Sequence, residues 1–186
     1  AGMITGNVTN NGALQFNRSD AVSFAGVVSG TGSVTQSGPN QVTLTANNTY
    51  TGGTTINSGA SLGLGNAGTT GMIVGDVANS GQLVFNRSDA VSFAGVVSGT
   101  GALTQAGANT VTLTGTNTYT GGTTINSGGI IIGADSNLGD TTGLLSINGG
   151  ALYLMASFTM ARNINIGGAG GLIDTSIWQL TTGGSL

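Results

Sequence analysis

A four-residue stretch, Asn-Arg-Ser-Asp, occurs twice in this chain and carries two of its three arginines. The binding candidates it supplies are Arg18 and Asp20 in the first copy and Arg87 and Asp89 in the second. One hypothesis is a recognition patch, or a carboxylate site, that recurs along the molecule. The alternative is an Asx-type turn whose Arg and Asp pair at an exposed corner, contributing about 0 to 1 kcal/mol. General grounds favour the turn.

The other acidic residues offer little chemistry. Asp135, Asp140 and Asp174 could suggest a Ca²⁺ site, and residues 167–175 are similar to a calcium-binding nonapeptide. Such sites draw several oxygen ligands from consecutive repeats, whereas this stretch occurs once. The chain has no His, Cys, Lys or Glu and no Asp-Asp or Asp-x-Asp pair, so convergent groups for general acid–base catalysis are missing. We expect no catalytic residue, no metal site and no cofactor.

Aromatic side chains are few, and most are expected in the core. Tyr50 and Tyr119 could stack on a ligand, but each precedes a Gly-Gly corner and is expected to pack against the neighbouring turn. Trp178 is either a core residue or an exposed anchor. The candidates for an aromatic core stack are the phenylalanines in strand-like segments, Phe16, Phe24, Phe85 and Phe93.

Composition excludes several classes of protein. A net charge of −3 with three separated arginines cannot neutralise a phosphate backbone, which excludes nucleic acid as a partner. Without Cys there is neither a disulfide framework nor a thiolate zinc site. No apolar run reaches eighteen residues, so no membrane-spanning helix is expected. Since 38% of the residues are hydrophobic and the net charge is low, we expect an ordered chain.

The elements that must position these residues belong to a 69-residue internal repeat. Residues 48–59 return unchanged as 117–128, and residues 17–59 match 86–128 at all but seven of 43 positions. A third copy diverges after Gly128 and has Met155-Ala156-Ser157-Phe158 in place of the Asn-Arg-Ser-Asp turn. We see no domain boundary and expect residues 1–186 to form one continuous segment, a fragment of a longer chain.

Constancy with period two predicts strands. Between residues 4–16 and 73–85 every second position is held, from Ile4/Ile73 to Phe16/Phe85, while the positions between them differ. Successive strand side chains point to opposite faces, so the constant row is expected to face inward. We predict an all-β fold with essentially no helix. An outward row is predicted for threonines, namely Thr43, Thr45 and Thr54, with Thr112, Thr114 and Thr123 as their copies.

The 69-residue period divides into three 23-residue turns, within the range of stacked solenoid repeats. Eight such turns at about 4.8 Å each would give a rod roughly 40 Å long. A parallel β-helix fits better than a sandwich, because each solenoid turn contacts only its neighbours and therefore tolerates duplication.

Two segments resemble the passenger-associated transport repeat of bacterial autotransporters: Val42-Thr43-Leu44-Thr45 continuing through 48–62, and its copy 111–130. Residues 27–32, 96–101 and 162–175 resemble other parts of the same passengers. The resemblance implies a right-handed parallel β-helix at the bacterial surface or secreted by the type V route. Export would use the chain's own C-terminal outer-membrane barrel, expected outside this sequence.

The function implied by this resemblance is the stalk of an adhesin that supports secretion and adhesion. Its partners would be host extracellular-matrix or cell-surface molecules, or other bacteria through self-association. Two alternatives remain open: the scaffold rod of an autotransporter protease or toxin whose active domain lies elsewhere, and an ice-binding β-solenoid. The ice-binding hypothesis requires Thr-x-Thr aligned on one flat face in every turn.

Overall fold

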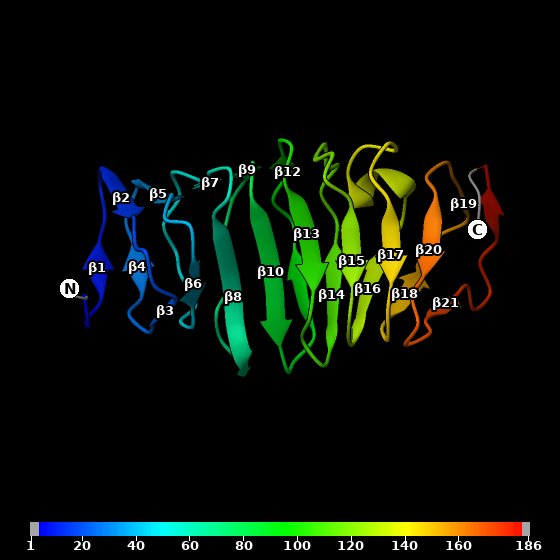
Figure 1. Cartoon of the computed structure of the whole chain (residues 1–186), viewed down its shortest axis with the longest axis horizontal. Coiled ribbons are helices and arrows are strands. Elements are labelled where there is room, and N and C mark those ends of the chain that lie inside the picture. Colours follow the sequence, from blue (N-terminus) through cyan, green and yellow to red (C-terminus); the bar gives the residue numbers. More distant parts are fainter. Residues whose placement is uncertain (1–3, 184–186) are drawn as a thin grey trace.

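The chain winds into a rod of stacked coils. The computed structural model describes residues 4–183, and every strand pairing in this range is parallel (Figure 1). The N-terminal coil lies at one end of the rod and the C-terminal coil at the other. About nine coils are stacked. The predicted parallel β-solenoid is confirmed, with about one turn more than expected.

Each coil has three sides, which line up into three faces along the rod. The third face is one eight-stranded sheet and lies toward the viewer in Figure 1, whereas the first and second are each interrupted once. The first face holds β1 (Val8–Thr9), β4 (Val28–Ser29), β11 (Val91–Phe93), β14 (Thr110–Leu113), β16 (Gly129–Ile132), β18 (Ala151–Leu154) and β21 (Leu172–Asp174). The second holds β2 (Ala13–Phe16), β5 (Ser33–Gln36), β7 (Thr54–Ile56), β9 (Val77–Asn79), β12 (Val97–Ser98), the single turn of 3₁₀ helix η1 (Asp135–Leu138), β19 (Phe158–Met160) and β22 (Leu180–Thr182). The third holds β3 (Val22–Phe24), β6 (Gln41–Leu44), β8 (Ser61–Gly68), β10 (Gln82–Arg87), β13 (Ala102–Gln105), β15 (Thr123–Ile125), β17 (Leu145–Ile147) and β20 (Ile164–Ile166).

The coil is shorter than the sequence predicted. The residue number rises by 20 from Val8 to its register partner Val28, and by the same step from Val34 to Thr54. The longest step between paired strands, from Thr54 to Val77, is 23. The prediction of a 23-residue turn is therefore wrong, because only the coil after β7 has that length.

The 69-residue repeat is consequently not a whole number of coils. Leu14 lies in β2 on the second face, whereas its copy Leu83 lies in β10 on the third. Likewise Val22 in β3 lies on the third face and its copy Val91 in β11 on the first. Each repeat thus comprises three and one third coils, and each copy is displaced by one face from the copy before it.

The inward row assigned from period two is confirmed in the second copy except at Gly75, which is exposed, and it is wrong for Ile4 of the first copy, which is 48% exposed. Ile73, Val77, Leu83 and Phe85 are buried, and the intervening residues 74, 76, 78 and 80 are exposed. The core is a column of aliphatic side chains from all three faces, with Phe16 against Phe24 and Phe85 against Phe93, both at 5.6 Å between ring centroids.

The outward prediction is wrong for two threonines. Thr54 and Thr123 are 3% and 0% exposed, and each shares a hydrogen bond with a buried tyrosine hydroxyl. Thr54 has the same parity as the buried Ile56, so strand alternation places both inward. The outward residue of β7 is Thr55.

The right-handed sense of the coil stays a prediction. It is supported by the strong preference of parallel crossover connections for right-handedness.

Charge placed on the inward row should unfold the neighbouring coils. Ile56→Asp and Phe85→Asp would each bury an unpaired carboxylate and are expected to lower the free energy of unfolding by more than about 3 kcal/mol. The outward control Thr55→Asp should change it by less than about 1 kcal/mol. Urea denaturation followed by circular dichroism measures these differences. Equal midpoints for the three variants would contradict the inward and outward assignment.

Candidate functional site

The two Asn-Arg-Ser-Asp stretches form local ion pairs at corners of the rod. Arg18 Nε and Nη2 donate to the two carboxylate oxygens of Asp20 at 2.8 and 2.7 Å. Arg87 repeats this fork on Asp89 at 2.9 and 2.8 Å. Hydrogen bonding from the guanidinium lowers the pKa of both carboxyl groups below its ordinary value. The geometry is that of the paired turn, and a binding role for these four residues stays a prediction.

The two corners nevertheless differ in how deeply the arginine is buried and in which groups it contacts. The Arg18 side chain is 18% exposed and that of Arg87 only 4%. Arg87 Nη1 also donates to Asn47 Oδ1 at 3.3 Å, and Nη2 donates to the carbonyl of Thr69. Asn47 Oδ1 in turn accepts from the Gly71 amide at 3.0 Å. Arg87 therefore stabilises residues 65–71. This segment makes the coil between β7 and β9 longer.

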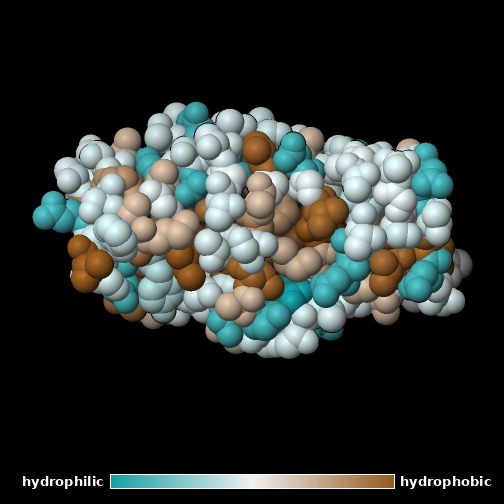
Figure 2. All heavy atoms as spheres, turned by 180° about the vertical axis from the view of Figure 1, so that it is seen from behind, coloured by the Kyte–Doolittle hydropathy of each residue, from teal (hydrophilic) through white to brown (hydrophobic). Residues whose placement is uncertain are grey.

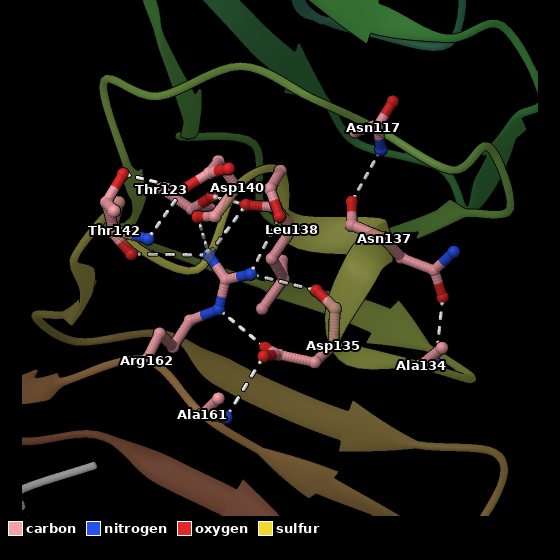
Figure 3. Close-up of polar contacts among 12 residues, drawn as sticks. Asn117, Thr123, Ala134, Asp135, Asn137, Leu138, Asp140, Thr142, Ala161 and Arg162 are labelled. Carbon is pink, nitrogen blue, oxygen red and sulfur yellow. Dashed lines mark hydrogen bonds and ion pairs between the residues drawn. The ribbon is translucent and has the colours of Figure 1, made fainter. Parts of the chain in front are cut away.

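Arg162 forms the most extensive polar cluster of the described residues (Figure 3). Its side chain is 0% exposed, and Nε donates to Asp135 Oδ1 at 2.6 Å. Nη1 donates to the carbonyl of Leu138 at 2.8 Å, and Nη2 to those of Asp135 and Gly139 at 2.9 Å. Longer bonds at 3.3 Å reach the carbonyls of Asp140 and Gly143. Arg162 thus satisfies the carbonyls of η1 and the turn after it, which no strand pairs.

The three aspartates considered for calcium are not brought together. Asp135 is bound to Arg162 and to the amide of Ala161, while Asp140 accepts from the amide and hydroxyl of Thr142. Asp174 caps its own turn by accepting from Ser176. Within residues 4–183 no group of three or more potential metal ligands gathers. These carboxylates stabilise separate turns.

Sequence reasoning missed the structural role of Arg162 because its partners lie 19 to 27 residues earlier in the chain. A signal was present. Arg162 lies two residues after Met160 and two before Ile164, both buried, so alternation places it inward. Arg87 has the same relation to Phe85.

The repeated segment 48–59 is built around a buried asparagine that substitutes for a strand. Asn48 Oδ1 accepts from the Val28 amide at 2.9 Å, and Nδ2 donates to the carbonyls of Ala46 and Met72 at 2.7 and 3.1 Å. Its copy Asn117 accepts from the Val97 amide at 2.7 Å. The side chain therefore connects three successive coils where regular pairing stops.

The rest of the segment closes the corner. The Tyr50 hydroxyl shares a 2.7 Å hydrogen bond with Thr54, and the ring is fully buried rather than available for a ligand. Tyr119 and Thr123 repeat this contact at 2.6 Å. Gly52 has no room for a side chain, since a Cβ would lie 2.5 Å from the carbonyl carbon of Gly32, and Gly53 has φ +79°. The fold therefore explains why asparagine, tyrosine, threonine and glycine stand at these positions of the repeated segment.

The two Thr-x-Thr stretches do not form one array. Thr43-Leu44-Thr45 runs along β6 on the third face, whereas its copy begins in β14 on the first face. Because each copy of the repeat is displaced by one face, the two pairs of threonine hydroxyls lie on different sides of the rod. An ice-binding surface would need them on the same side. Trp178, left open by the sequence, is 39% exposed beside Ile177 at 86%.

Comparison with known proteins agrees with this geometry. Residues 34–60 and 103–132 match the family model described as "Passenger-associated-transport-repeat". Two stretches of the chain are therefore similar to this repeat. Each begins with a strand, β5 or β13, and contains the asparagine, tyrosine and glycine corner described above.

A curated relative of these repeats is named "Adhesin BmaC autotransporter", from Brucella suis biovar 1 (strain 1330). It is 49% identical over 106 residues, which cover 57% of this chain and 3% of the relative. The chain thus spans a small part of the relative's length. No solved structure matches this chain. Among the described residues there is no helix with the length and apolarity required to span a bilayer.

Removing the Arg162 guanidinium should destabilise the rod strongly. Arg162→Met would leave the Asp135 carboxylate without its cationic partner and several buried carbonyls without the guanidinium donor, at an expected cost of about 3 to 5 kcal/mol in the free energy of unfolding. Arg18→Met is the matched control, and its loss should be much smaller, because that ion pair is more exposed to solvent. Chemical denaturation of both variants measures the difference. If Arg162→Met lowered the free energy of unfolding as little as the control does, the Arg162 cluster would not be stabilising the rod.

The buried tyrosines predict loss of stability at alkaline pH. Burial raises the pKa of Tyr50 and of Tyr119 to about 12 from an ordinary value of 10.0. Stability is unaffected below pH 10, where folded and unfolded chains both keep these protons. It falls as pH rises from 10 to 12, because the unfolded chain ionises first, by up to about 3 kcal/mol per tyrosine.

Urea midpoints at pH 9, 10, 11 and 12 test this dependence. The double variant Tyr50→Phe/Tyr119→Phe, which has no ionisable group at these positions, should show a much flatter profile. An unchanged profile in that variant would assign the alkaline transition to other groups.

Proposed function

We propose that this chain is a segment of the surface-exposed β-helical stalk of an autotransporter adhesin. The observation that carries the proposal is the pair of passenger-associated-transport-repeats, set in a continuous parallel solenoid. The 49% identity to a protein named as an autotransporter adhesin supports the adhesive assignment. The stalk would hold an adhesive surface away from the cell and assist secretion of the chain.

The proposed location is the bacterial cell surface, or the medium after release. A rod of this kind suits export, because each coil contacts only its neighbours and can be added to the stack as the chain emerges. The chain has no Cys, so no disulfide can form before export is complete.

We assign the segment no catalytic role. The repeated residues act on the fold: Asn48 and Asn117 join coils, while Tyr50 and Tyr119 fill the core. The charged side chains of the Arg–Asp corners are engaged with one another. Proposed partners are extracellular-matrix proteins, host cell-surface molecules, or a second rod on another bacterium.

Bead adhesion tests this function. Beads that display the chain should bind layers of extracellular-matrix protein, or one another, at least several-fold more than beads carrying an unrelated folded protein at equal density. Microscopy of retained beads under flow gives the measurement. Retention no higher than that of the unrelated protein would leave the segment a spacer without adhesion of its own.

A further inference from the structure

The outward residues of the first face change from polar to apolar along the rod. One outward row runs through register partners from Thr112 to Ile131 and Tyr153. The neighbouring row ends at Leu172, which is 50% exposed. The Tyr153 ring lies across Gly129, where a Cβ would meet a ring carbon at 2.5 Å. The coils of β16, β18 and β21 therefore present an aromatic ring flanked by aliphatic side chains.

The adjoining corner adds further apolar side chains. Met155 and Ile177 each lie three residues before the register partners Phe158 and Leu180, so they occupy the same place in successive coils. Both are exposed, and Trp178 beside Ile177 is the only tryptophan of the chain. The outward residues of this region are called the apolar patch, which consists of Ile131, Tyr153, Met155, Leu172, Ile177 and Trp178.

The apolar patch belongs to the diverged third copy of the repeat. Earlier in the chain, Thr43 is followed in register by Gly63 and Val84. Its copy Thr112 is followed at the same places by Ile131 and Tyr153. Outward side chains do not fill the core, so packing of the rod does not require these larger residues. Exposed apolar residues gathered in one area, with Tyr and Trp among them, are typical of a surface that binds another molecule.

The charge beside the apolar patch is negative. Asp174 is the register partner of Tyr153, so the two side chains are neighbours on the same face. The amide and hydroxyl of Ser176 both donate to Asp174 Oδ1, which leaves Oδ2 as an acceptor for a cation within the described part of the chain. Each of the three arginines is already paired with an aspartate. A complementary partner therefore carries apolar side chains together with a positive charge.

Other occupants complement this surface less well. Two copies of the chain joined patch to patch would bring one Asp174 carboxylate toward the other, and like charges repel. Binding to a lipid surface calls for basic residues beside one broad apolar side. The rear of the rod instead shows hydrophobic residues mixed with polar ones (Figure 2). A basic and apolar polypeptide segment fits both the side chains and the charge.

We infer that the apolar patch binds a polypeptide segment that carries aliphatic or aromatic side chains and a lysine or arginine. Tyr153, Trp178 and the aliphatic residues bury the apolar side chains of the partner, and Asp174 accepts a hydrogen bond from its cation. The use of this patch as a contact of an adhesive stalk rests on the function proposed above. Binding of the peptide itself is measured without it.

Fluorescence of Trp178 measures this binding directly, because the chain has no other tryptophan. The probes are three short peptides without tryptophan, one of alternating leucine and lysine, one of leucine and glutamate, and one of serine and lysine. The leucine–lysine peptide should shift the emission to shorter wavelength and bind at least about tenfold more tightly than either of the others. Equal affinity for the serine–lysine or the leucine–glutamate peptide would overturn the inference, as would the absence of a shift.

Variants test where the peptide binds. Leu172→Ser/Ile177→Ser removes two exposed side chains of the apolar patch and should weaken binding of the leucine–lysine peptide at least about tenfold. The matched control Val74→Ser/Leu144→Ser removes side chains that are 44% and 46% exposed elsewhere on the rod, and it should bind like the unsubstituted chain. Full affinity of the first variant, or an equal loss in the control, would overturn the site.

The charge contribution has its own variant. Asp174→Asn keeps an acceptor for Ser176 and removes the negative charge, so it should weaken the leucine–lysine peptide and not the leucine–glutamate peptide. Equal effects on both peptides would overturn the role of Asp174. If beads adhere in the assay above but no peptide binds, this inference falls and the adhesive function stands. Peptide binding without bead adhesion gives the reverse result.

Discussion

The parallel hydrogen bonding of each coil onto the one before it is the constraint on which the structure depends. Because the register between coils is fixed, an inward side chain always lies over another inward side chain, as Leu83 lies over Leu62 and under Leu103. Extra residues enter a coil where strand pairing is irregular, as in the exposed residues 66–70 beside the register shift between β8 and β10. The core therefore stays uniform while the step in residue number between paired strands varies, from 19 between Thr110 and Gly129 to 23 between Thr54 and Val77.

That constraint explains what could be read from the sequence and what could not. Strand parity is local, so the buried row Ile73, Val77 and Leu83 followed from the pattern alone. The number of residues per coil cannot be read from neighbouring residues, because the 69-residue period is compatible with three coils or with three and one third shorter coils. Only the register between strands, as between Val8 and Val28, separates these possibilities. The wrong outward assignment of Thr54 could have been avoided from the sequence, because Thr54 lies two residues before Ile56, an inward residue of the same strand.

The buried arginines show how the rod accommodates a departure from regular coiling. Where a coil lengthens into the 65–71 segment or η1, carbonyl groups lose their strand partners, and burying them unpaired would cost free energy. Arg87 and Arg162 supply donors from the following coil at these two places. A guanidinium suits the task because its five donors are fixed in one plane and it stays charged. The candidate site residues were visible as charges, but which carbonyls they serve depends on the corner geometry.

Rotation by one third has a further consequence for the sequence of the repeat. The strand with Leu14 lies on the second face, its copy with Leu83 on the third, and the corresponding strand of the diverged copy, β18, on the first. Every strand must therefore fit every face, which favours inward residues of similar size such as Val, Leu and Ile. A repeat that meets this condition can be duplicated without regard to whole coils. The outward residues are under no such condition, so the surface can change while the rod grows.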